Sequence, residues 1–130
     1  MIVIDASLVT EMVLSSPRGR RVAKEIEQQS VSLAAPDVLK LEVLQTLRRL
    51  AYRDAVTQSE ADRAVALMFD LPIELYPHED IIRRIWSLRH NFTAYDASYV
   101  ALAELLQTDF WTGDRKFKAL PGMDIQILTY

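Results

Sequence analysis

The sequence predicts an α/β fold built on a largely parallel sheet. Short apolar runs alternate with helical patterns along the 130 residues, and this alternation is typical of parallel strands joined by right-handed helical crossovers. Half of the residues are hydrophobic and a quarter are charged, which is the balance of a globular protein. The length corresponds to one domain over residues 1–130 and leaves little room for two.

In the N-terminal half, apolar runs and helix-breaking residues define the elements. Ser16-Pro17 separates two helical patterns, and Pro36-Asp37 opens a third that extends to about Tyr52. The other elements expected here are strands at Ile2–Ile4 and Val31–Ala34 and helices at Ala6–Leu14 and Arg18–Gln29.

In the C-terminal half, the run Thr57-Gln58-Ser59-Glu60 is a capping box, in which the threonine and the glutamate bind free backbone amides of the first helical turn. A helix is therefore expected from there to about Phe69. The remaining expected elements are strands at Pro72–Leu75, Phe110–Thr112 and Ile125–Leu128, helices at Pro77–His90 and Ala94–Gln107, and a helical turn at Arg115–Leu120.

The composition limits the chemistry available to the chain. Cysteine is absent and only two histidines occur, so disulfides and thiolate metal sites are excluded and a histidine-rich zinc site is not expected. We find no signal peptide and no apolar run near the ~18 residues that span a bilayer. These observations predict a cytoplasmic protein with no membrane partner.

The net charge of −3 and the pI near 5.3 argue against a nucleic-acid binder. This argument weakens if several acids share a metal site, because bound cations would then offset their charge. It weakens further because the basic residues are clustered. The clusters are Arg18, Arg20, Arg21 and Lys24; Arg48, Arg49 and Arg53; Arg83, Arg84 and Arg89; and Arg115, Lys116 and Lys118.

Two aspartates follow apolar strands. Asp5 ends the first predicted strand, and Asp114 follows the strand Phe110–Thr112. Ligands of parallel α/β sheets bind at the carboxyl ends of the strands, so both carboxylates are candidates for a functional site. Thr112 can donate a hydrogen bond that orients a neighbouring carboxylate. The alternatives are a helix N-cap for Asp5 and a simple turn for Asp114.

Two further acids lie on predicted helices. Asp96 falls within the apolar arc of the predicted helix Ala94–Gln107, which also includes Tyr95 and Tyr99. An unpaired carboxylate on such a core-facing side is costly. Its partner is either a metal ion or the backbone of a cap formed with Thr93. Glu42 begins a polar stripe that includes Gln45, Thr46, Arg49 and Arg53, with apolar residues on both sides. This stripe is either a solvated face or the wall of a cleft.

The joint placement of these four acids predicts a metal site. Carboxylates that are brought together repel one another unless protons or a cation intervene. A set of oxygen ligands selects hard cations, Mg²⁺ or Mn²⁺. Such ions polarise a phosphodiester and activate a bound water.

Four segments of the chain resemble, in order and spacing, the motifs of the PIN-domain family. The segments are Ile2-Val3-Ile4-Asp5-Ala6-Ser7, Pro36 followed by Leu41-Glu42-Val43, Thr93-Ala94-Tyr95-Asp96-Ala97, and Thr112-Gly113-Asp114 followed by Arg115-Lys116-Phe117. The resemblance implies a three-layer sandwich, with the sheet between helices. It also implies endonucleolytic cleavage of RNA by a Mg²⁺ or Mn²⁺ cluster held by Asp5, Glu42, Asp96 and Asp114.

Several finer expectations come with this resemblance. Ser7 and Thr112 match positions that support the metal cluster. Many relatives carry asparagine one helical turn after the second-motif glutamate, where this chain has Gln45, so the role of Gln45 stays open. Arg89 and Arg115 flank motif residues, and they either contact the RNA backbone or are surface charges that maintain solubility.

In its minimal length, the chain resembles the VapC toxins of type II toxin–antitoxin pairs. That similarity implies a small antitoxin partner, whose tail enters the acidic site, and a homodimer. The expected reaction is in-line attack on phosphorus by a metal-activated water, which leaves a 5′-phosphate and a 3′-hydroxyl.

Two other classes of function fit parts of the sequence. A Mg²⁺-dependent receiver or phosphatase also carries an aspartate at a strand end. A receiver has paired acids after its first strand and a haloacid-dehalogenase-type phosphatase has Asp-x-Asp, whereas this chain has Asp5-Ala6-Ser7. A non-catalytic module would use the acidic pocket to bind a basic peptide, and it would bind no divalent ion.

Overall fold

The computed structural model of residues 1–130 confirms an α/β fold with one five-stranded sheet. The strands lie in the order β3-β2-β1-β4-β5, and each neighbouring pair is parallel. The sheet therefore brings the first strand of the chain beside the fourth. The strands are β1 Ile2–Ile4, β2 Leu33–Pro36, β3 Ile73–Tyr76, β4 Phe110–Thr112 and β5 Ile127–Thr129.

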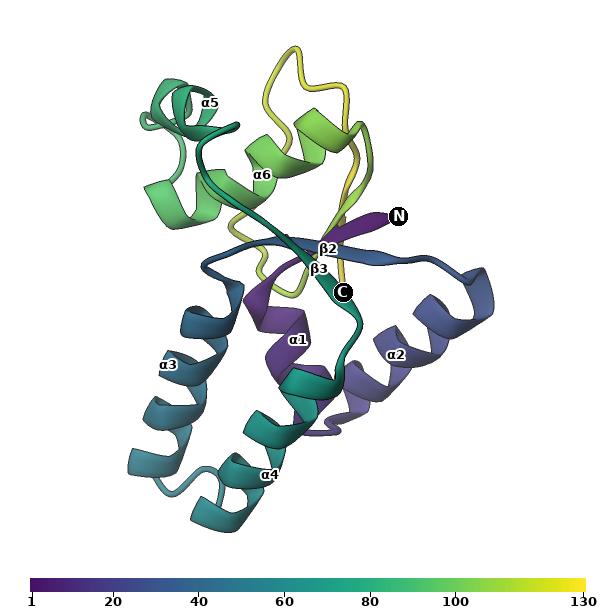
Figure 1. The fold of residues 1–130 in the computed structure, drawn as a ribbon, viewed down its shortest axis with the longest axis vertical. Helices are drawn as coiled ribbons and strands as arrows, with labels where there is room; N and C mark the ends of the chain where they lie inside the picture. Colours follow the sequence, from purple (N-terminus) through teal and green to yellow (C-terminus); the bar gives the residue numbers. More distant parts are fainter.

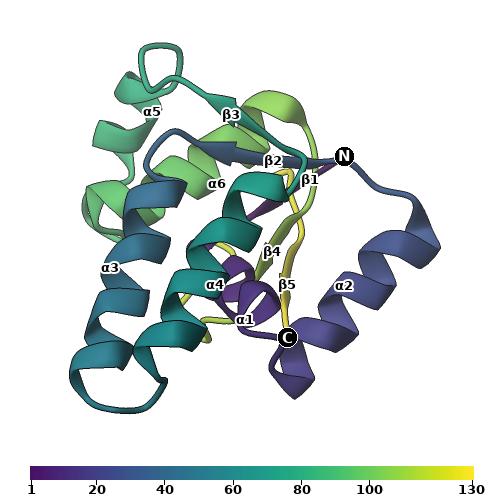
Figure 2. The same ribbon diagram turned by 60° about the horizontal axis from the view of Figure 1, so that its bottom comes forward.

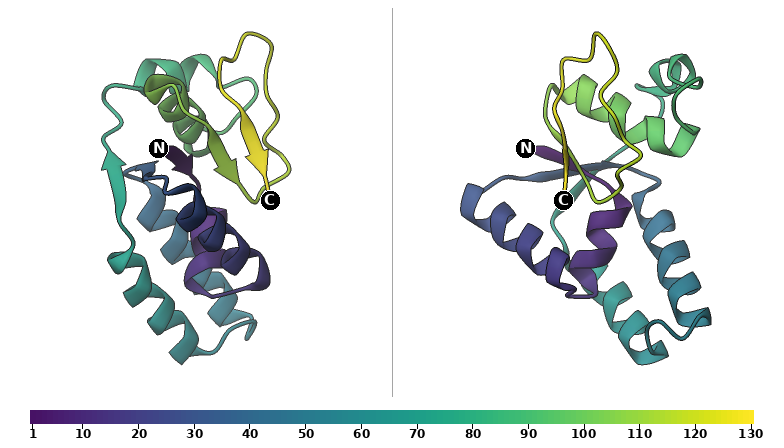
Figure 3. Two further views of the ribbon diagram at one scale, coloured as in Figure 1. Left: turned by 90° about the vertical axis from the view of Figure 1, so that its right-hand side faces the viewer. Right: turned by 180° about the vertical axis from the view of Figure 1, so that it is seen from behind.

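Helices cover both faces of this sheet, which gives the three layers that the resemblance to the PIN-domain family implies (Figure 1). One face carries α1, which packs against α2, α3 and α4, and the other carries α5 and α6 (Figures 2 and 3). No helix combines the length and the apolar character that a bilayer-spanning segment needs. The helices are α1 Ala6–Val13, α2 Pro17–Gln29, α3 Leu39–Tyr52, α4 Gln58–Asp70, α5 Ile82–Ser87 and α6 Ala94–Leu106.

The central strands are short and buried on both sides. Every residue of β1, β2 and β4 is buried, which explains why these strands read as continuous apolar runs rather than as alternating ones. Across the α6 side of the sheet, the rings of Tyr99 and Phe110 stack with centroids 5.9 Å apart. The packed strands thus form a rigid base for the polar residues at their carboxyl ends.

Side-chain caps fix the helix starts as the sequence predicts. The hydroxyl of Thr57 accepts a hydrogen bond from the amide of Glu60 at 3.0 Å, which confirms the threonine half of the capping box before α4. The hydroxyl of Thr93 accepts from the amide of Asp96 at 3.1 Å at the start of α6. The second cap matters for function because it orients the helical turn that carries Asp96.

The strand β2 begins two residues later than predicted. Ser30 adopts the left-handed conformation at the end of α2 (φ 52°), and the amide of Val31 still bonds to a carbonyl of that helix. These residues close the helix and are not available to the sheet. At the other end, the amide of Asp37 extends the ladder by bonding to the carbonyl of Tyr76 at 2.9 Å. The following helix consequently begins at Leu39.

Two helical segments predicted in the C-terminal half differ in the structure: one begins later than predicted and the other is absent. The predicted helix Pro77–His90 begins with a turn that buries Ile81 in the core (2% exposed) before α5 starts. The predicted helical turn Arg115–Leu120 is absent, and the chain there makes a single turn and continues irregularly. The amide of Lys116 donates to the carboxylate of Asp114 at 2.9 Å, a local bond that competes with helical bonding.

Candidate active site

Asp5 lies at the carboxyl end of β1 and is buried (4% exposed). Its Oδ1 accepts hydrogen bonds from the hydroxyl of Ser7 at 2.6 Å and from the amide of Leu8 at 3.1 Å. Its Oδ2 accepts from the hydroxyl of Thr112 at 2.5 Å. Asp5 is therefore the N-cap of α1, as one interpretation of the sequence held. A cap needs only one carboxylate oxygen, so the cap alone does not account for the second oxygen.

The surroundings of Asp5 oppose its ionisation. Burial raises the pKa of Asp5 above its ordinary value, although the bonds from Ser7, Thr112 and the amide of Leu8 lower it. The nearby charge of Asp114 raises the pKa further. A cation close to this carboxylate would favour the ionised form and relieve the repulsion.

The loop after β4 brings Asp114 next to Asp5. The buried hydroxyl of Thr112 donates to Asp5 and also accepts from the amide of Asp114 at 3.0 Å. The hydroxyl of Ser7 accepts from the amide of Gly113 at 2.9 Å. A Cβ at Gly113 would lie only 3.1 Å from the Ser7 hydroxyl, so glycine allows this close approach. Ser7 and Thr112 thus tie the ends of β1 and β4 together.

Glu42 reaches the site from the first turn of α3. Its Oε1 accepts a hydrogen bond at 2.9 Å from the hydroxyl of Tyr99, a residue that is 1% exposed. Burial raises the pKa of Glu42; the bond from Tyr99 lowers it, and the charges of Asp96 and Asp5 raise it. Burial and the Glu42 carboxylate in turn raise the pKa of Tyr99, so its hydroxyl remains a donor to Glu42.

The side chain of Asp96 does not form the backbone cap that the sequence offered as one of its two partners. Thr93 does cap α6, but through the backbone amide of Asp96. The carboxylate of Asp96 instead pairs with the ammonium of Lys116 at 2.9 Å, and its side chain is 15% exposed. The assignment of Tyr95 to the same buried arc was wrong, because Tyr95 is 63% exposed. The first turn of α6 borders an open hollow, and both side chains line it.

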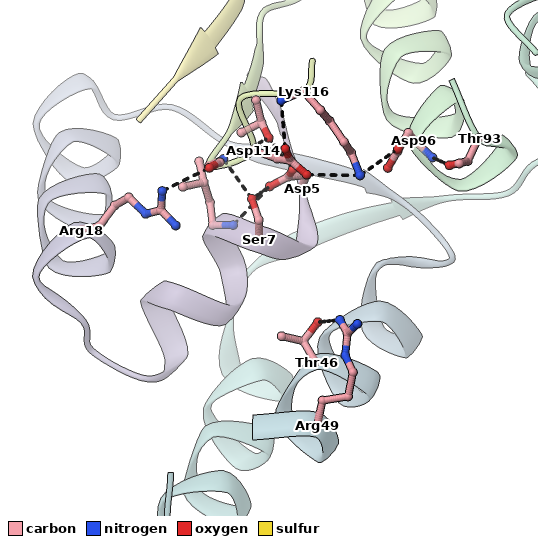
Figure 4. Close-up of polar contacts among 12 residues, drawn as sticks. Asp5, Ser7, Arg18, Thr46, Arg49, Thr93, Asp96, Asp114 and Lys116 are labelled. Carbon is pink, nitrogen blue, oxygen red and sulfur yellow. Dashed lines mark hydrogen bonds and ion pairs between the residues drawn. The ribbon is translucent and has the colours of Figure 1, made fainter. Parts of the chain in front are cut away.

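All four predicted acids line one cleft at the carboxyl edge of the sheet. The inner hollow measures about 380 Å³ and adjoins an outer hollow of about 590 Å³. Thr46 and Arg49 follow Glu42 along α3 (Figure 4). Both line the two hollows, and Gln45 lines the outer one. The polar stripe of α3 is therefore a cleft wall from Glu42 to Arg49, whereas Arg53 is exposed and lies outside the lining.

Arg18, near the start of α2, supports the loop that carries Asp114. Its guanidinium donates to the carbonyls of Gly113 and Tyr130 at 3.1 and 3.2 Å and pairs with Glu11 at 3.2 Å. These contacts join α1, α2 and the loop after β4 on the side of the cleft opposite Lys116 (Figure 4). Arg18 lines the cleft, but its hydrogen bonds are already committed to the protein.

The structure places the two predicted RNA-contacting arginines outside the lining of the cleft. The guanidinium of Arg89 lies 4.5 Å over the ring of Trp86, and Arg115 is exposed on the loop after β4. Besides Arg18, the basic residues on the cleft walls that the sequence reasoning did not select are Arg49 and Lys116. Their spacing from the acids was the available signal. Arg49 follows Glu42 by two helical turns, and Lys116 follows Asp114 by two residues.

The chemistry of the cleft fits a hard divalent cation. Its candidate ligands are carboxylate oxygens alone, the set that Mg²⁺ and Mn²⁺ prefer, and two of the four carboxyls have raised pKa values that a cation would lower. In this structure, no three acidic or histidine side chains converge closely enough to hold one ion together. The ammonium of Lys116 lies between two of the acids.

Comparison with known proteins identifies the family. The model of the PIN domain matches residues 2–123, a span that contains all four acids. This chain belongs to the PIN domain family. Among curated PIN-domain relatives, ribonuclease VapC1 of Mycobacterium tuberculosis is 36% identical over 126 residues, which are 96% of this chain and 94% of that protein. Ribonuclease VapC9 of the same organism is 38% identical over 115 residues, covering 88% and 86%.

Solved structures show the same PIN-domain fold at lower identity. VapBC2 of Rickettsia felis, crystallised with a DNA fragment from its promoter, aligns with a TM-score of 0.70 and 11% identity over 100% of this chain and 99% of that one. VapC20 of M. tuberculosis, a toxin that cleaves the sarcin–ricin loop, aligns with a TM-score of 0.63 and 15% identity over 88% and 90%. At these identities the likeness establishes the fold alone.

Proposed function

We propose that this PIN-domain chain is a Mg²⁺- or Mn²⁺-dependent endoribonuclease that acts as the toxin of a type II toxin–antitoxin pair. The observation that carries the proposal is the meeting of acids from four separate segments in one cleft. The chain is also similar over nearly its whole length to VapC ribonucleases. The proposal includes RNA as substrate, a cognate antitoxin as partner and a homodimer as the assembly.

The chain's own residues prepare the cleft for this chemistry. When bound, a divalent ion would polarise the phosphodiester and activate a water molecule. Ser7 and Thr112 fix the two oxygens of Asp5, and Tyr99 fixes one oxygen of Glu42. Such supporting bonds hold ligands in one orientation. The proposed ligands and catalytic residues are Asp5, Glu42, Asp96 and Asp114.

Arg49 is the best placed group on the cleft wall to contact an RNA phosphate. It lies on α3 beside the acids, and its one polar contact is a long bond of 3.4 Å to Thr46. The net charge of −3 is therefore compatible with RNA binding. The acids that make the protein acidic include a cluster in the cleft, where bound cations offset them, while Arg49 stands at its rim.

Cleavage of total cellular RNA by the purified full chain tests the proposal. We expect cleavage with MgCl₂ or MnCl₂ and none with EDTA, and product ends with a 5′-phosphate and a 3′-hydroxyl. Asp5→Asn and Asp96→Asn should abolish both cleavage and Mn²⁺ binding. The matched control is Asp109→Asn, because Asp109 precedes β4 at its opposite end. Cleavage that persists in EDTA, or that Asp96→Asn leaves intact, would contradict the assignment.

A further inference from the structure

Lys116 places its ammonium between two of the four acids (Figure 4). Its Nζ lies 2.9 Å from Oδ2 of Asp96 and 3.2 Å from Oδ2 of Asp114. Its backbone amide donates to the other oxygen of Asp114, Oδ1, at 2.9 Å. Lys116 therefore contacts both oxygens of Asp114 and links the loop after β4 to the first turn of α6.

These contacts use oxygens that a divalent ion in the cleft would need. Mg²⁺ lies about 2.0–2.1 Å from each ligand oxygen, so an ion bound by Asp96 and Asp114 would stand within a few ångströms of the ammonium. Two cations at that separation repel each other. The ammonium and the ion thus compete for the same carboxylates.

The position of Lys116 allows it to leave. Its side chain is 55% exposed, compared with 15% for Asp96 and 38% for Asp114. Apart from the two ion pairs, its ammonium has a distant contact with the ring of Phe117, 5.6 Å from the centroid. Ion pairs with this much exposure are weak, so a doubly charged ion can displace the ammonium into solvent.

We propose that Lys116 is a tethered cation that occupies the ion site in the metal-free protein and is displaced when Mg²⁺ or Mn²⁺ binds. This inference rests on the proposed function, because it takes the acids as metal ligands. It assigns Lys116 a positioning role, in which it sets the affinity of the site for the ion. Removal of the ammonium therefore tightens metal binding, whereas loss of a merely structural contact would weaken it.

Calorimetric titration of the metal-free full chain with MnCl₂ tests this prediction without any use of activity. Lys116→Met keeps most of the apolar stem and removes the charge, and we expect it to bind Mn²⁺ about fivefold more tightly, which corresponds to about 1 kcal/mol for two weak ion pairs. Lys116→Arg keeps the charge and should retain the wild-type affinity. The matched control is Lys118→Met, because Lys118 is exposed nearby on the same loop and should leave the affinity unchanged.

Each outcome decides between the two proposals. Unchanged or weaker Mn²⁺ binding by Lys116→Met, with the wild type binding normally, overturns the role of Lys116 and leaves the nuclease proposal intact. Binding by no variant, the wild type included, overturns both. A second measurement covers the case in which Lys116→Met fails to fold. Amine labelling of the wild type, read by mass spectrometry, should show Lys116 reacting faster with Mn²⁺ present and Lys118 reacting at a constant rate; an unchanged rate at Lys116 overturns the inference.

Discussion

Replacing Thr112 with valine keeps the shape of the side chain and removes the hydroxyl that joins two of the acids. Thr112 is fully buried (0% exposed). Its hydroxyl donates to Oδ2 of Asp5 at 2.5 Å and accepts from the amide of Asp114 at 3.0 Å. The variant would leave one buried carboxylate oxygen without a donor and one amide without an acceptor.

The size of the effect follows from these two bonds. A buried hydrogen bond to a charged group contributes about 1.5–3 kcal/mol, and an unsatisfied amide costs about 1 kcal/mol. We therefore expect the free energy of unfolding of the metal-free protein to fall by about 2.5–4 kcal/mol near neutral pH.

The loss should also depend on pH. Burial raises the pKa of Asp5 and the bond from Thr112 opposes that rise, so the variant should raise this pKa further. A carboxyl with a raised pKa in the folded state contributes stability below its unfolded pKa and loses that contribution as pH rises through the folded pKa. The deficit of Thr112→Val should therefore be larger at about pH 7 than at about pH 4.

Urea unfolding in EDTA, followed by circular dichroism at both pH values, measures this loss. Thr112→Ser keeps the hydroxyl and should stay close to wild type. The matched control is Thr129→Val, because Thr129 of β5 is the register partner of Thr112 in β4 but is exposed. If Thr112→Val is within about 0.5 kcal/mol of that control, or if its deficit does not grow with pH, the reasoning is refuted.

Two further predictions follow from the site and its supports. Because Asp5 and Glu42 both have raised pKa values, protons should compete with the ion, and Mn²⁺ affinity measured by calorimetry should fall as the pH is lowered from about 7 towards about 4; a flat profile would contradict this. A Cβ at Gly19 would lie 2.0 Å from the carbonyl oxygen of Glu11, so Gly19→Ala should force α2 away from α1 and destabilise the fold by about 3 kcal/mol. Thermal melts should show this loss against the exposed control Lys24→Ala, and equal melting temperatures would count against the close packing.

The parts of the site that depend on local sequence could be predicted. β1 and β4 were predicted to the residue, because each is an apolar run that ends in a polar residue. Their acids then followed from the rule that parallel strands present their carboxyl ends at one edge. The start of β2 was predicted two residues too early because Ser30 adopts the left-handed conformation and delays the strand. A serine in the sequence does not indicate that conformation.

The contacts between distant segments could not be predicted in this way. The hydrogen bond from Tyr99 to Glu42 joins residues 57 positions apart, and Tyr99 reads in the sequence simply as part of an apolar face. Lys116 reads as one member of a basic cluster, although its ammonium faces two acids. Local periodicity identifies the elements that carry such groups, but their partners depend on tertiary packing.

The position of β4 has a consequence for when the protein can act. The bond between Thr112 and Asp5 closes a loop of 107 residues, and β4 must insert beside β1 before Asp114 reaches the cleft. A nascent chain that ends at Tyr76 already contains three of the five strands but neither Asp96 nor Asp114. The four acids can therefore come together only after most of the chain has been made and β4 has joined the sheet.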